Sequence, residues 1–136
     1  MDMSSINRLA VAAATVAAFI LGGLWYSPAL FGKAWMKANG FTAEDLEKNA
    51  NMAKVFGFSF IFTLIMAINL AMFLAYPEIT FQVGAMYGFF TGFGWIAMGI
   101  GIVALFERKS WSYILINGGY MTVALLLMGA ILGAWR

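Results

Sequence analysis

Apolar residues fill four long stretches of this chain, and only short polar connections separate them. The stretches cover approximately residues 9–30, 55–76, 81–106 and 111–135. About 20 apolar residues in an α-helix rise far enough to cross a hydrocarbon layer about 30 Å thick. The pattern therefore predicts an all-α membrane protein in which four transmembrane helices form one domain over residues 1–136.

Residues 31–54 join the first two spans, and the beginning of this connection predicts a short amphipathic helix. Lys33 and Lys37 fall four residues apart on one face. The other face is apolar and holds Leu30, Phe31, Ala34, Trp35 and Ala38. We expect such an interfacial helix to lie in the plane of the lipid headgroups, with its lysines directed toward phosphates.

Several residues predict where the helices begin and end. Pro28 ends or kinks the first helix, and Gly40 is a natural stop for the amphipathic one. Thr42 and Asp45 have the spacing of a capping box, so they predict the start of a further helix that continues into the second span. Ser110 is expected to cap the fourth span.

Small residues recur every four positions in each span. The sets are Ala10, Ala14, Ala18 and Gly22; Ala67, Ala71 and Ala75; Gly84, Gly88 and Gly92; Gly129 and Gly133. Stripes of this kind let two helix backbones approach closely in a bilayer. They either pack the four helices of one chain or mate with another copy, and we expect a homo-oligomer.

Composition narrows the function classes. Hydrophobic residues make up 63% of the chain and charged residues 10%, whereas soluble domains carry about 25% charged residues. The net charge of +2 is spread along the chain and forms no basic stripe, so we expect no nucleic-acid partner. The chain has no cysteine and no histidine, so we also predict no metal and no cofactor.

The distribution of lysine and arginine predicts the orientation. The first and third connections hold Lys33, Lys37, Lys48, Lys54, Arg108 and Lys109, while the opposite side holds Arg8 and Arg136. Because basic loops stay in the cytoplasm, we expect connection 31–54 to be cytoplasmic and both termini to lie outside. Membrane lipid is the expected partner.

Polar residues near the cytoplasmic ends of the spans suggest a ligand site. No span has a central charged residue, which argues against proton-coupled transport. The candidate pocket, for a lipid headgroup or a small anion, comprises Trp25, Tyr26, Ser27, Lys33, Glu107, Arg108, Asn117 and Tyr120. The alternative is an ordinary interfacial belt, in which Glu107 pairs with Arg108 or Lys109 and Asn117 bonds a neighbouring backbone.

The segment that runs from Gly22 to Met36, GGLWYSPALFGKAWM, resembles the signature of the domain-of-unknown-function 1761 family. The later Asn117-Gly118-Gly119-Tyr120 motif and the segment from Gly129 to Trp135 fit the same pattern. The resemblance implies a small four-helix protein, mostly bacterial, and hence a multi-pass protein of the bacterial inner membrane. It implies no activity.

Three function classes follow. We favour a homo-oligomeric structural or lipid- or small-ligand-binding module. The alternative is an oligomeric pore or carrier for a small neutral or anionic solute. A membrane enzyme is least favoured, because only Glu107, Tyr26, Ser27 and Tyr120 are candidate catalytic groups, and we predict no catalysis.

Overall fold

The computed structural model describes residues 3–48 and 51–136, and it is helical throughout these two segments apart from turns. Four helices are long and apolar enough to cross a membrane: α1 (Arg8–Trp25), α4 (Met52–Phe73), the continuous run Phe81–Phe106, and α7 (Trp111–Ala134). The predicted all-α multi-pass membrane fold is confirmed. Asn49 and Ala50 of the predicted 31–54 connection, and the side chain of Lys48, lie outside this description.

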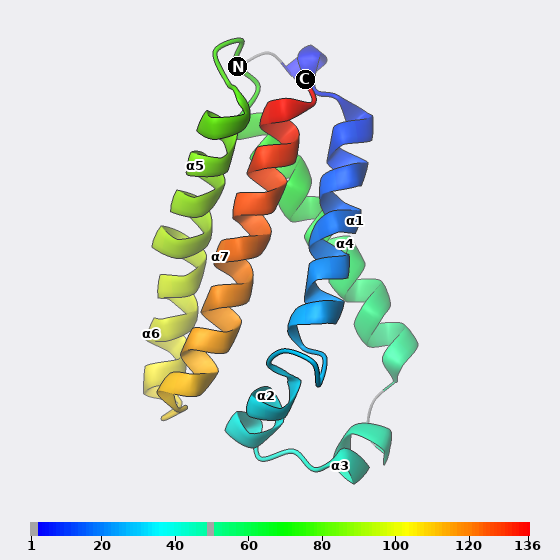
Figure 1. The fold of residues 1–136 in the computed structure, drawn as a ribbon, viewed down its shortest axis with the longest axis vertical. Coiled ribbons are helices and arrows are strands. Elements are labelled where there is room, and N and C mark those ends of the chain that lie inside the picture. Colours follow the sequence, from blue (N-terminus) through cyan, green and yellow to red (C-terminus); the bar gives the residue numbers. More distant parts are fainter. Residues whose placement is uncertain (1–2, 49–50) are drawn as a thin grey trace.

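The four spans form one bundle with two distinct ends (Figure 1). α7 lies between α1 and the Phe81–Phe106 run, and it is the most buried of the spans. The chain termini and the α4–α5 connection lie at one end, which we call the terminal end. The opposite end holds α2 (Gly32–Asn39), α3 (Ala43–Lys48) and the α6–α7 turn. We call it the basic end because these connections carry most of the lysines and arginines.

α1 is bounded by side-chain and turn contacts. Asn7 caps it by accepting hydrogen bonds from the amides of Leu9 and Ala10. The helix ends at Trp25, before the limit of the 9–30 stretch, because the chain turns at Ser27. The carbonyl of Ser27 accepts from the amide of Gly32 at 2.9 Å. Only a residue without Cβ fits at Gly32, since a Cβ there would lie 2.5 Å from the Tyr26 carbonyl oxygen.

The predicted amphipathic helix is present as α2, and Gly40 ends it in the left-handed conformation, with φ of 70°. The Thr42 amide donates to Asp45 Oδ2 at 2.8 Å and the Asp45 amide donates back to Thr42 Oγ1 at 3.2 Å, so the capping box is confirmed. Hydrogen bonding of the Asp45 carboxylate to the backbone amide of Thr42, and then to its side chain, lowers the pKa of this carboxyl. The expectation that this helix continues into the second span is wrong, because Asn51 is extended and caps α4 as a new helix.

The tightest helix contact joins α5 (Phe81–Thr91) to α7. A Cβ on Gly84 would overlap the backbone of Gly129, and one on Gly88 would overlap the backbone of Leu125. Between α5 and α6 (Met98–Phe106) lies a π-helical turn, η2 (Gly92–Ala97). Its extra residue presents Ala97 to α7, where Gly118 meets it.

The remaining small-residue stripes are also used inside the chain. Each contributes residues that are nearly or fully buried in one core with larger apolar side chains of α4 and α7. The buried members are Ala10, Ala14, Ala18, Ala67, Leu70, Ala71, Leu74, Leu125, Met128 and Leu132. The stripes therefore pack the helices of a single chain.

Candidate functional site

A cluster of aromatic side chains and one amide lies at the basic end, between α1, α2 and α7. Trp25, the last residue of α1, donates from its indole Nε1 to the carbonyl of Ile116 at 2.9 Å. Its ring reaches that carbonyl because residue 119 is glycine. A Cβ at Gly119 would lie 3.1 Å from Cζ2 of Trp25.

Asn117 connects α7 to the end of α1. The hydroxyl of Tyr26 donates to Asn117 Oδ1 at 2.7 Å, and Asn117 Nδ2 donates to the carbonyl of Tyr113 at 3.0 Å. The ring of Tyr26 also packs edge-on against Trp35 of α2, with ring centroids 5.8 Å apart. α2 is thereby attached to the bundle through the aromatic contact.

Tyr120 closes the cluster toward the membrane interior. Its hydroxyl donates to the carbonyl of Ala18 at 3.0 Å, and its ring meets that of Tyr26 at 5.4 Å. A Cβ at Gly22 would lie 2.9 Å from the Tyr120 hydroxyl oxygen. The glycine thus provides the space in which this tyrosine crosses from α7 to α1.

The structure brings four of the eight predicted site residues together and leaves the others apart. Trp25, Tyr26, Asn117 and Tyr120 form this cluster, in which each side chain makes a hydrogen bond within the protein. Ser27 donates to the carbonyl of Leu24. Lys33, Glu107 and Arg108 are exposed and form no described hydrogen bond with the cluster.

Sequence reasoning placed Trp35 only in the headgroup plane and missed its contact with Tyr26. Its position on the apolar face of α2 was a usable signal, because that face had to meet either lipid or the ends of the spans. The glycines at 22 and 119 were missed as receptors for rings. The sequence around a helical glycine does not predict which side chain will pack against it.

A separate groove of about 320 Å³ lies on the other side of α7, between α7 and α6. Its walls are apolar residues of α6, and polar groups lie at its basic end. The lining residues are Gly99, Ile100, Val103, Ala104, Glu107 and Tyr113. Sequence reasoning named Glu107 and missed the groove.

The groove lies where side chains, and not glycine backbone, meet between α6 and α7. Near the terminal end, α5 and α7 contact each other through glycine backbone. Farther along, a Cβ at Gly101 would come no closer than 3.7 Å to Ile114, and one at Gly99 would meet nothing within 4 Å. At this depth α7 carries Tyr113 and Ile114 in place of glycines.

Charged groups at the rim of the groove are not paired with one another. Within residues 3–48 and 51–136, no ion pair joins Glu107 to Arg108 or Lys109, so that part of the interfacial-belt alternative is wrong. The ammonium of Lys109 instead lies 5.5 Å from the centroid of the Tyr113 ring. Arg108 has a φ of 60°, and its amide and that of Lys109 close the end of α6 on the carbonyls of Leu105 and Ala104.

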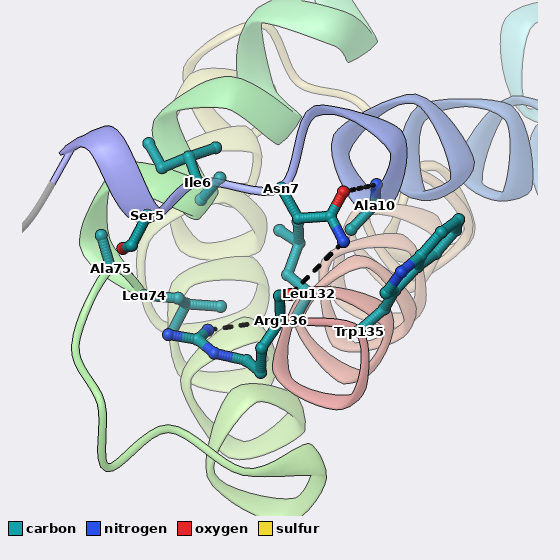
Figure 2. A pocket seen from close by; sticks show the side chains of 10 residues that line it. Ser5, Ile6, Asn7, Ala10, Leu74, Ala75, Leu132, Trp135 and Arg136 are labelled. Atoms are coloured by element: carbon teal, nitrogen blue, oxygen red, sulfur yellow. Dashed lines mark hydrogen bonds between the residues drawn. The ribbon is translucent and has the colours of Figure 1, made fainter.

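A second hollow lies at the terminal end, between the ends of α1, α4 and α7 (Figure 2). Arg136 spans it, donating to the carbonyl of Tyr76 at 2.7 Å. Arg136 also donates to the Leu132 carbonyl at 3.3 Å, and Asn7 donates to the Arg136 carbonyl at 3.5 Å. Its volume of about 20 Å³ suits a single water molecule. Across the described segments, no three carboxylates gather closely enough to hold a metal ion.

Comparison with known proteins gives a family and no activity. No curated protein and no solved structure matches the chain. The family described as "Protein of unknown function (DUF1761)" matches residues 9–133, a range that contains both the aromatic cluster and the groove. The chain therefore belongs to the DUF1761 family.

Proposed function

We propose that this protein is a membrane module that binds one lipid in the groove between α6 and α7. The observation that carries the proposal is an open apolar groove between two membrane spans, which ends at Glu107 and Tyr113 where the spans leave the bilayer. An acyl chain would lie along the walls formed by Gly99, Ile100 and Val103. The headgroup would then lie beside Glu107 and Tyr113.

The polar rim has to supply the selectivity. Lipid tails are as apolar as leucine, so contact with the groove walls alone favours no lipid over its neighbours in the bilayer. A preference arises only where fixed polar groups meet a particular headgroup. Glu107 is exposed and unpaired to its neighbouring cations, and Lys109 lies over Tyr113, so both signs of charge are present at the rim.

The aromatic cluster supports a structural role beside this groove. The hydroxyls of Tyr26 and Tyr120 already donate to Asn117 and to the Ala18 carbonyl, and the Ser27 hydroxyl is bonded to its own turn. Three of the four candidate catalytic groups are therefore engaged in holding α1 and its turn in place. This favours a binding role over catalysis.

Filling the groove tests the proposal. Gly99→Leu would place a side chain in open space within the groove. Gly57→Leu is the matched control, because a Cβ at Gly57 also meets nothing within 4 Å and this glycine lies near the start of α4, outside the groove. We expect purified Gly99→Leu protein to retain at least about threefold less lipid in native mass spectrometry, since the added side chain competes for the same volume. Equal retention in both variants and the natural protein would reject the groove.

We further propose that the basic end faces the cytoplasm of a bacterial inner membrane, with both termini outside. The unequal numbers of basic residues at the two ends support this orientation. Because the chain has no cysteine, single cysteines report sidedness directly. Lys37→Cys should react with an impermeant maleimide only after the cells are permeabilised, whereas Glu78→Cys, in the turn at the terminal end, should react in intact cells. The reverse pattern would invert the orientation.

A homo-oligomer remains a proposal with a reduced basis. The small-residue stripes that suggested it contact one another within one chain, so lipid binding in the α6–α7 groove does not require a second copy. The two hollows described above lie at opposite ends of the bundle, and no observation specifically favours the pore.

A further inference from the structure

We propose that the groove selects a zwitterionic phospholipid whose headgroup carries a primary ammonium, such as phosphatidylethanolamine. This inference rests on the proposed lipid-binding function and names the headgroup. Two opposite charges at the rim support it: the acidic residue Glu107, which lines the groove, and the Lys109 ammonium, which lies over the ring of the lining Tyr113.

Glu107 supplies the recognition of the headgroup ammonium. Glu107 lines the groove, and its exposed side chain forms no ion pair with the cations beside it among the described residues. A primary ammonium offers three N–H donors to such an acceptor, and charge-assisted hydrogen bonds are the stronger kind. A quaternary ammonium has the same charge and no N–H donor. An anionic headgroup without an amine would leave the carboxylate unpaired and facing a like charge.

Lys109 supplies the partner for the phosphate. Its ammonium is held near the Tyr113 ring, 5.5 Å from the centroid, and Tyr113 lines the same groove as Glu107. A cation fixed on an aromatic face keeps its N–H donors available to an anion on its other side. The carboxylate and the ammonium therefore stand at one rim, separate from each other, as the two charges of a zwitterionic headgroup require.

Arg108 adds an independent observation. It occupies a left-handed backbone conformation, with φ of 60°, at the position that closes α6. Glycine is the residue that fits this position without steric cost. The chain instead carries a cation there, next to Lys109. The charge of this exposed residue, next in sequence to Glu107, adds to the attraction for a phosphate.

The test is competition among headgroups in a bilayer. The natural protein is placed in nanodiscs of equimolar phosphatidylethanolamine, phosphatidylcholine and phosphatidylglycerol, with identical chains, and the lipid that stays bound is counted by native mass spectrometry. We expect phosphatidylethanolamine to be enriched about twofold to fivefold, in keeping with an exposed ion pair. Glu107→Gln should abolish the enrichment, and Glu107→Asp should retain part of it.

The control is Glu78→Gln, which removes the same charge at the terminal end and should leave the enrichment unchanged. Lipid retained without headgroup preference, but lost in Gly99→Leu, would overturn the headgroup assignment and leave the proposed function standing. Retention that neither Gly99→Leu nor Glu107→Gln alters would overturn both. Displacement of the bound lipid by excess water-soluble glycerophosphoethanolamine would show that the site takes a free solute, and would overturn the assignment to a lipid.

Discussion

The two sides of α7 at the basic end differ in how their polar groups are used. Toward α1 and α2, Tyr26, Asn117 and Tyr120 are bonded within the protein, and the rings fill the space between the helices. Toward α6, an open groove lies between the helices, and among the described residues no cation is paired with Glu107. On the α1 and α2 side of α7, the many polar and aromatic residues serve to hold the helices together. On the α6 side, an unpaired charge lies beside an open groove, and this is the side that a ligand can reach.

The difference originates in which residues of α7 face each neighbour. Gly119 faces α1 and accepts the Trp25 ring, so that side closes. Tyr113 faces α6 and lines the groove, so that side stays open. One helix thus supplies both a closed and an open face within two turns of its length.

Gly88→Leu is expected to have the largest effect, because it should disturb the aromatic cluster and the groove together. The new side chain would overlap the backbone of Leu125, separating α5 from α7 and disturbing the helix that carries both faces. We expect a loss of more than about 3 kcal/mol of stability, measured by denaturant titration in detergent. Gly94→Leu, whose Cβ meets nothing within 4 Å, should be nearly neutral. A stable Gly88→Leu protein would show that the glycine contact is dispensable.

Tyr26→Phe should affect the aromatic cluster and leave the groove unchanged. It removes the donor to Asn117 Oδ1 and leaves that oxygen half-buried without a partner, at a cost of about 1–3 kcal/mol. Lipid retention and headgroup preference should not change, because Tyr26 does not line the groove. Tyr87→Phe on the exposed face of α5 is the control, with an expected change close to zero. Lost lipid binding in folded Tyr26→Phe protein would instead place the ligand at the aromatic cluster.

Arg108→Gly should raise the stability of the protein, whereas the two preceding substitutions lower it. Relief of the left-handed backbone is expected to raise the free energy of unfolding by about 1 kcal/mol, while removal of the charge weakens the retention of phosphatidylethanolamine. Arg108→Ala removes the same charge but keeps a Cβ, so it should reduce lipid retention without the gain in stability. If both variants are equally stable, the backbone at this position is not strained.

The sequence predicted those features that depend on local chemistry. The four spans follow from apolar runs, and the Gly40 stop, the Thr42–Asp45 capping box and the Ser110 cap follow from side chains within four residues of the bonds they make. The eight-residue pocket was predicted from depth alone. Four of its members share a depth in the membrane and do lie in contact. Depth alone does not determine on which side of α7 a residue lies.

The groove was not predictable in this way, because its width depends on pairs of residues from different helices. Gly99 of α6 and Tyr113 of α7 line the same groove, and nothing in either segment alone identifies the other as its neighbour. The break between α3 and α4 was missed for a related reason. The charged and apolar pattern is compatible with one continuous helix, and the cap at Asn51 ends that continuity.

The π-helical turn at Gly92–Ala97 has a consequence for how this span tolerates changes in length. An α-helix turns about 100° per residue, so deleting one residue ordinarily rotates everything beyond it onto a different face. In this span, deleting one residue inside the turn, such as Gly94, would convert a wide turn into an ordinary one and leave both flanking helices in phase with α7. A deletion in the middle of a membrane span is usually poorly tolerated. Here the span can lose one residue at this turn while the groove residues of α6 keep facing α7.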